Sequence, residues 1–204
     1  LGFVHGVMNT DNMSISGLTI DYGPYGWLEN YDPLWTPNTT DLQNKRYRFG
    51  QQPMIAGWDF ARLVEAISPL IAQTEKLQQL MELFDDELIG NYRQMWCSKL
   101  GFNEYDKEMV EQLIGLLHSS ETDMTIFFRL LSTLKEPNVE ELEFCFYDFD
   151  STPKDDWNRW LVKYLGLVKS DRAEAMNLVN PKYVLRNWMA QLAIDKAEQD
   201  DFGL

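Results

Sequence analysis

HGVMNTDN, at residues 5–12, is a polar stretch between two apolar runs, LGFV at residues 1–4 and MSISGLTI at residues 13–20. A second polar stretch, DYGP at residues 21–24, follows directly. Residues 13–15 and 18–20 are short alternating segments separated by Ser16 and Gly17, which predicts a β-hairpin with a two-residue turn. HGVMNTDN would enter this hairpin and DYGP would leave it, so the hairpin brings both polar stretches to one edge.

Oxygen-bearing side chains stand at both ends of the expected hairpin, Asp11 and Asn12 before it and Asp21 after it. Mg²⁺ takes oxygen ligands and is usually held by one or two carboxylates, while phosphates and waters fill the remaining positions. The two loops therefore suit a hard divalent cation. In the plainer alternative Asp11 and Asn12 only initiate a turn by binding nearby amides, but this leaves the second polar stretch unexplained.

Helical periodicity dominates the chain after a composition shift near residues 51–53. The apolar spacing predicts a helix over 53–70 and a second over 75–100, ended by Gly101. Asn180 and Pro181 suit the N-cap and first position of the last helix. The remaining pattern predicts helices over 104–118, 122–135, 138–146, 153–165 and 181–199. The expected fold is mainly α with a short β-hairpin, in which residues 1–50 form the loop and hairpin segment and residues 51–204 form the helical part of one continuous domain.

Composition and charge exclude several classes of protein. The 204 residues are 45% hydrophobic, which is typical of a globular domain, and no apolar run approaches the ~20 residues of a membrane-spanning helix. Lys and Arg total 18 against 32 Asp and Glu, a net charge of -14, so binding to nucleic acid or to an anionic membrane is disfavoured. A nucleotide bound through a metal stays compatible with this charge, because the cation supplies the positive charge. Cys97 and Cys145 lack metal-site spacing and predict neither a zinc site nor a disulfide framework.

The spacing of the two polar stretches resembles that of protein kinases. A kinase catalytic loop reads HRDxxxxN and is followed, after a short hairpin, by DFG. His5 and Asn12 have the separation of that His and Asn, and Asp21 begins DYG where DFG would stand. Val7 occupies the position of the kinase catalytic Asp, which is a large departure. His5 is expected to support the loop and not to act in catalysis.

Longer strings resemble the selenoprotein O family, also called YdiU. They are GFVHGVMNTDNMSISGLTIDYGPYGWLENYDP at 2–33, RYRFGQQP at 46–53 and NPKYVLRNWMAQLAIDKAE at 180–198. The resemblance implies the C-terminal lobe of a kinase-like fold in a protein adenylyltransferase, which transfers AMP from ATP to Ser, Thr or Tyr hydroxyls of proteins. It places the proton acceptor on Asp11 and the Mg²⁺ or Mn²⁺ ligands on Asn12 and Asp21, and Asp21 would also approach the nucleotide phosphates through the metal.

The same resemblance implies that the chain is a fragment of a longer protein. The nucleotide-binding loop and phosphate-binding arginines would precede it, so the fragment alone is expected to be inactive. Relatives carry Asn-His-Ser-Asp where this chain has Asn38-Thr39-Thr40-Asp41, which leaves any role of that His without a counterpart. The expected location is cytoplasmic in a bacterium and mitochondrial in a eukaryote. An alternative function is a noncatalytic pseudokinase module that binds nucleotide or a protein partner, which Val7 favours.

Overall fold

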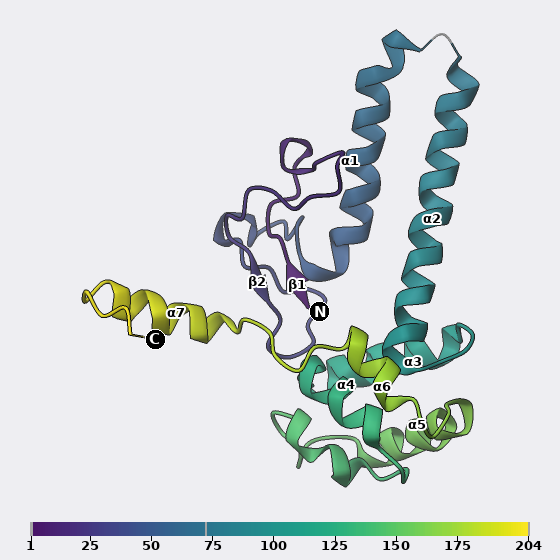
Figure 1. Ribbon diagram of the computed structural model, residues 1–204, viewed down its shortest axis with the longest axis vertical. Coiled ribbons are helices and arrows are strands. Elements are labelled where there is room, and N and C mark those ends of the chain that lie inside the picture. The colour runs from purple at the N-terminus through teal and green to yellow at the C-terminus, as the bar shows by residue number, and fades with distance from the viewer. Residues whose placement is uncertain (1, 72, 204) are drawn as a thin grey trace. The chain divides into compact units, whose positions relative to one another are not determined.

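The computed structural model of the chain describes residues 2–71 and 73–203 (Figure 1). It is mainly helical, as the sequence predicts, and contains one two-stranded sheet, formed by other residues than those of the predicted hairpin. Contacts divide it into two compact units. One comprises Leu1–Phe3, Gly26–Asp32 and Trp96–Leu204, and the other comprises Val4–Tyr25 and Pro33–Met95.

A short pair of strands frames the two polar loops. β1 (Phe3–Val4) pairs with β2 (Gly26–Trp27), and the ring of Phe3 lies edge-on to that of Trp27, with centroids 5.1 Å apart. Residues 5–25, which include both polar loops, therefore begin and end at the same small sheet.

The hairpin predicted between the polar loops is shorter than expected. Its two arms meet only in an isolated antiparallel bridge between Met13 and Thr19. The turn is closed by the N–H of Gly17 donating to the carbonyl of Ser14 at 3.0 Å, so Ile15 and Ser16 are its central residues, one position earlier than predicted. Ile15 is 87% exposed, so no burial supports a longer pairing of the arms.

The first two long helices lie where the apolar spacing predicts them. α1 (Gln52–Ile67) begins with a proline in its first turn and continues into a short 3₁₀ turn at Ser68–Leu70. α2 (Thr74–Leu100) follows, and the ring of Phe84 stacks on that of Phe60 at 4.3 Å. Gly101 ends α2 with a φ of +72°, the left-handed conformation expected of a glycine C-cap.

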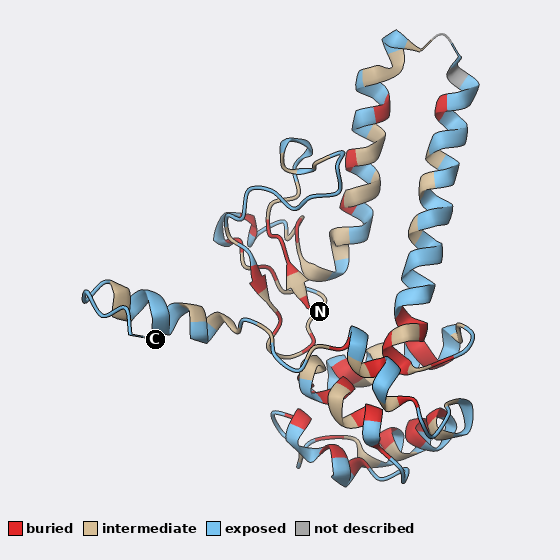
Figure 2. Ribbon diagram, viewed as in Figure 1, coloured by how far each residue is buried: buried red, intermediate tan, exposed pale blue. Residues whose placement is uncertain are grey.

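Four further helices build the core of the unit that contains Trp96–Leu204, where Figure 2 shows many of the buried residues gathered. They are α3 (Lys107–Ser119), α4 (Met124–Thr133), α5 (Lys154–Leu167) and α6 (Ala173–Val179). Aspartates cap two of them: Asp106 accepts from the N–H of Met109, and Asp123 from that of Ile126. Trp157 and Trp160 are almost fully buried on α5, as the side chains of a core-facing helix should be.

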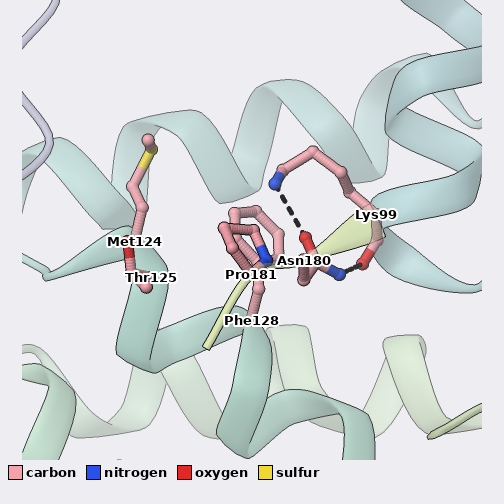
Figure 3. A pocket seen from close by; sticks show the side chains of 6 residues that line it. All are labelled: Lys99, Met124, Thr125, Phe128, Asn180 and Pro181. Atoms are coloured by element: carbon pink, nitrogen blue, oxygen red, sulfur yellow. Dashed lines mark hydrogen bonds between the residues drawn. The ribbon is translucent and has the colours of Figure 1, made fainter. Parts of the chain in front are cut away.

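The C-terminal third departs from the prediction in three places. Residues 138–146 form a 3₁₀ helix, Val139–Cys145, and not an α-helix. α6 was not predicted at all. The last helix, α7 (Asn187–Ala197), begins several residues later than expected, and Asn180 is the C-cap of α6, not the N-cap of the last helix. The side chain of Asn180 is buried and bound to Lys99 (Figure 3), so it is not free to cap a helix that follows it.

Both cysteines are free thiols in the interior of this unit. Cys97 lies near the end of α2, and Cys145 ends the 3₁₀ helix. Burial raises the pKa of the Cys97 thiol and, more strongly, that of Cys145. Among the described residues, no helix has the length and apolar character needed to span a bilayer.

Candidate functional site

Asp11 and Asn12 lie on a short 3₁₀ turn, Thr10–Asn12, at the end of the first polar loop. The backbone N–H of Asn12 donates to the carbonyl of Asn9 at 2.9 Å, and its side-chain Nδ2 donates to the carbonyl of Val7 at 3.0 Å. These bonds fix the amide plane and leave Oδ1 open to another partner. Asp11 is exposed, and its carboxylate makes no hydrogen bond or ion pair with any described residue.

Asp21 begins the second polar loop in an unusual backbone conformation. Its φ is +53°, in the left-handed region that few residues other than glycine adopt. The N–H of Gly23 donates to the carbonyl of Asp21 at 2.8 Å, which closes a tight three-residue turn with Tyr22 at its centre. The Asp21 carboxylate is exposed and, within the described part of the chain, has no hydrogen-bond or ion-pair partner.

His5 joins the two loops. Its ring nitrogen Nε2 lies 2.8 Å from the carbonyl oxygen of Ile20, the residue before Asp21. The other ring nitrogen accepts the N–H of Val7 at 3.3 Å, so the hydrogen-bond network assigns the proton to Nε2, which donates to Ile20. The backbone N–H of His5 donates to Oε1 of Gln52 at 3.1 Å. His5 is 6% exposed with every donor and acceptor of its ring in use, in keeping with the predicted supporting role.

A second contact between the loops involves Gly6, whose φ is +83°. A Cβ atom at this position would lie 2.5 Å from the carbonyl oxygen of Pro24 and 3.2 Å from Cγ of Pro37. Only a residue without a side chain lets the first loop pass so close to the end of DYGP. The loops that carry Asp11, Asn12 and Asp21 are therefore in direct contact at Gly6 and Pro24 and through the His5 to Ile20 bond.

Polar residues from later in the chain bind the first polar loop, residues 5–12. Nδ2 of Asn38 donates to the carbonyl of Gly6 at 3.0 Å, and the Tyr47 hydroxyl donates to Oδ1 of Asn9. Asp41 in turn accepts the N–H of Tyr47 at 2.8 Å. Asn38 and Asp41 are the outer residues of the Asn-Thr-Thr-Asp segment, and both have structural partners.

Asp59, on α1, is a buried carboxylate close enough to interact electrostatically with Asp11, and the sequence analysis did not single it out. It is 5% exposed, and neither of its carboxylate oxygens has a hydrogen-bond partner among the described residues. Gln52, which binds His5, lies seven residues earlier and hence on the same face of the helix. α1 packs against the turn that holds Asp11, and burial raises the pKa of Asp59, with Arg46 opposing this shift and Asp11 adding to it.

The two polar loops carry oxygen-bearing side chains of the kind that a hard divalent cation takes as ligands. No group of three or more His, Cys, Asp or Glu side chains in the described ranges is arranged to hold a metal ion. Asn12 has a fixed amide with an open oxygen, and Asp21 has an unpaired exposed carboxylate, so each offers a hard oxygen ligand. A cation held by one or two protein oxygens, with phosphates and waters completing its shell, is the usual arrangement for Mg²⁺.

Comparison with known proteins decides the family. A sequence model described as Protein adenylyltransferase SelO matches residues 1–203. The chain belongs to the SelO family. It is 52% identical to a protein nucleotidyltransferase YdiU of Flavobacterium johnsoniae over 221 residues, which include 100% of this chain and 42% of that relative.

Other SelO relatives agree in extent. The protein nucleotidyltransferase YdiU of Aromatoleum aromaticum is 47% identical, with 100% of this chain and 42% of the relative covered. That of Rhodopirellula baltica is 45% identical, with 100% and 43% covered. The chain thus spans less than half the length of these SelO relatives, and the polar loops at its start belong to the matched region.

The close approach at Gly6 can be tested against a matched glycine. Gly6→Ala should destabilise the protein well beyond Gly17→Ala, because both substitutions place a side chain at positive φ, at a cost of ~1–2 kcal/mol, but only residue 6 adds a clash, worth roughly 1–3 kcal/mol more. Gly17 has a φ of +72° and no atom within 4 Å of its Cβ position. Urea unfolding of both variants measures the difference, and equal losses would show that the loops do not meet at Pro24.

Asp59 predicts a pH-dependent stability. A buried acid whose native pKa is raised binds protons more readily in the folded than in the unfolded state, so its contribution falls as pH rises above its ordinary value of 3.8. Asp59→Asn should therefore be more stable than the wild type at pH 7, by roughly 1 kcal/mol, with the gain shrinking as pH falls toward 4. Thermal unfolding from pH 4 to 8 measures this, with Asp86→Asn, an exposed change on α2, as control. A gain that does not vary with pH would contradict the unpaired carboxylate.

Proposed function

We propose that the full-length protein is a metal-dependent protein adenylyltransferase that transfers AMP from ATP to Ser, Thr or Tyr hydroxyls of other proteins. Membership of the SelO family supports the reaction class. The observation that carries the proposal for this chain is the joining of the two polar loops by His5 and Gly6, with the carboxylates of Asp11 and Asp21 exposed and, among the described residues, unpaired. We further propose that this chain forms the C-terminal lobe of a kinase-like fold, and that neither nucleic acid nor a membrane is a partner in the reaction.

Each residue of the loops has a distinct proposed role. Asp11 accepts the proton of the attacking hydroxyl. The hydroxyl oxygen forms a bond to the α-phosphorus of ATP, and pyrophosphate leaves. Asn12 and Asp21 hold Mg²⁺ or Mn²⁺, and Asp21 thereby approaches the nucleotide phosphates. The bound cation would supply positive charge where negative charge develops on the phosphoryl centre.

Val7 is compatible with this assignment. In the kinase pattern the catalytic carboxylate stands at position 7, whereas here the carboxylate nearest to the metal ligand is Asp11, directly before Asn12. The carbonyl of Val7 has another use, because it accepts the amide of Asn12 and orients it. The proposal thus assigns to position 7 a backbone role that does not depend on its side chain.

A noncatalytic pseudokinase module is the second candidate, favoured by the absence of a carboxylate at position 7. Labelled ATP distinguishes the two. The full-length protein is incubated with ATP carrying label at the α or the γ phosphate, together with a protein extract, and protein-bound label is measured. We expect the α label alone on protein. The γ label would indicate a kinase, and no label at all would favour the pseudokinase. Without the rest of the full-length protein, this chain is expected to show no transferase activity.

Asp11→Ala and Asp21→Ala should both slow transfer in the full-length protein, but in different ways. Loss of Asp21 removes a metal ligand and should nearly abolish both the rate and metal-dependent nucleotide binding. Loss of Asp11 removes the proton acceptor, worth roughly 10²–10⁴-fold in rate, while binding of Mg-ATP is retained. Calorimetry and transfer rates measure the two effects. If Asp11→Ala loses nucleotide binding and Asp21→Ala keeps it, the roles are reversed.

A further inference from the structure

Two arginines converge on the ring of Trp58, a residue of α1 that is 42% exposed. The guanidinium carbon of Arg46 lies 4.5 Å from the centroid of this ring and 5.7 Å from that of Tyr47. The guanidinium carbon of Arg62 lies 5.4 Å from the Trp58 ring. The face of an aromatic ring attracts a cation, but two cations on the same ring also repel each other. The pair of arginines therefore favours the binding of an anion.

Arg46 is the member of this pair that has donors to offer. Its guanidinium makes no hydrogen bond or ion pair with any residue that the structure describes. Arg62, in contrast, is paired with Glu65 at 2.6 Å. The lack of an acidic partner for Arg46 is unexpected in a chain where 32 Asp and Glu outnumber 18 Lys and Arg. Two aromatic rings thus hold a guanidinium whose N–H donors are unused by the described part of the chain.

Asp59 is close to Arg46 but does not occupy these donors. Burial raises the pKa of Asp59 and the charge of Arg46 opposes this shift, yet the two side chains form no ion pair. Successive residues of a helix point about 100° apart. Asp59 is 5% exposed and faces inward, whereas the ring of Trp58 that carries Arg46 is partly open to solvent. The inward carboxylate adds a favourable field for the guanidinium and leaves its donors free for a partner from outside.

This arginine lies beside the first polar loop. Tyr47, whose ring contacts Arg46, donates its hydroxyl to Oδ1 of Asn9. α1, which carries Trp58, packs against the turn at Thr10–Asn12. In the proposed reaction Asp11, on that turn, accepts the proton of the attacking hydroxyl. Residues that flank this hydroxyl in the acceptor protein must therefore pass close to the same turn.

We propose that Arg46, held by Trp58 and Tyr47, binds an aspartate or glutamate side chain of the acceptor protein near the modified hydroxyl. This inference rests on the proposed transferase function and names the class of its acceptor. A planar guanidinium can form two parallel hydrogen bonds with a carboxylate, which a lysine cannot. The net charge of -14 does not prevent this, because charges more than ~8 Å apart are largely screened at physiological salt. At shorter range the two arginines on Trp58 dominate.

The test uses the full-length protein and synthetic peptides that contain one serine, threonine or tyrosine. Glutamates flank this residue on both sides in one set of peptides, and glutamines flank it in the matched set. Peptide affinity is measured by fluorescence anisotropy with an ATP analogue that has a methylene group between the α and β phosphorus atoms, so that no AMP is transferred. Transfer rates are measured with ATP.

We expect the wild type to prefer the glutamate peptides by at least roughly tenfold, because the glutamine peptides lack a hydrogen bond between charged groups. Arg46→Met should lose this preference and keep its affinity for Mg-ATP. Arg46→Glu should reverse it and bind lysine-flanked peptides better than glutamate-flanked ones, a result that a merely structural role would not give.

Two further variants complete the comparison. Arg46→Lys keeps the charge without the planar fork and should retain only part of the preference, which covers the case in which Arg46→Met does not fold. Arg159→Met, an exposed change on α5, should behave as the wild type does.

The proposal is overturned if the wild type does not prefer glutamate, or if Arg46→Met keeps the preference. It is also overturned if Arg46→Met loses affinity for Mg-ATP while peptide binding is unchanged, since Arg46 would then bind the nucleotide. Glutamate peptides that bind through Arg46 but never receive AMP would support this binding site and contradict the proposed reaction, so the two failures can be told apart.

Discussion

The hydrogen bond from His5 to the carbonyl of Ile20 is the constraint on which both polar loops depend. It joins positions fifteen residues apart, and the second ring nitrogen and the backbone N–H of His5 are also bound. Because both ring nitrogens of His5 are hydrogen-bonded, the ring cannot change tautomer without breaking a bond, and its orientation is fixed. The consequence is a pair of loops held in contact, while among the described residues the carboxylates of Asp11 and Asp21 have no hydrogen-bond or ion-pair partner. Polar groups left free on a fixed backbone are what a binding site requires.

Local signals in the sequence predicted most helices, because helix spacing and end residues act over a few neighbours. Pro53 and Gly101 marked the beginning of α1 and the end of α2 correctly. The failures arose where a distant partner overrides the local preference. Asn180 has the chemistry of an N-cap, but its side chain is held by Lys99, 81 residues away. The hairpin was predicted too long, since alternating apolar residues favour strands only when one face is buried, and Ile15 is exposed.

The residues of the candidate site also fall into two groups, those that the sequence could predict and those that it could not. Asp11, Asn12 and Asp21 could be singled out because their spacing in the chain is itself the signal. The residues that hold the loops could not: Gln52 binds His5 across 47 positions, and Asn38 binds Gly6 across 32. Asp59 was missed for another reason. A carboxylate in a helix is ordinarily read as solvent-facing, and only its place on the same face as Gln52 shows that it is turned inward.

The reactivity of the two buried cysteines reports how often the unit that contains Trp96–Leu204 opens. Thiol reagents attack the thiolate, and both Cys97 and Cys145 are buried with raised pKa values, so in the folded chain neither is readily attacked. Alkylation then requires the surrounding helices to open, and its rate reports the frequency of that opening. Because Cys145 ends the 3₁₀ helix and Cys97 lies near the end of α2, the two rates would separate local opening of one segment from cooperative opening of the whole unit. A surface cysteine added for spectroscopy would meet little background from either.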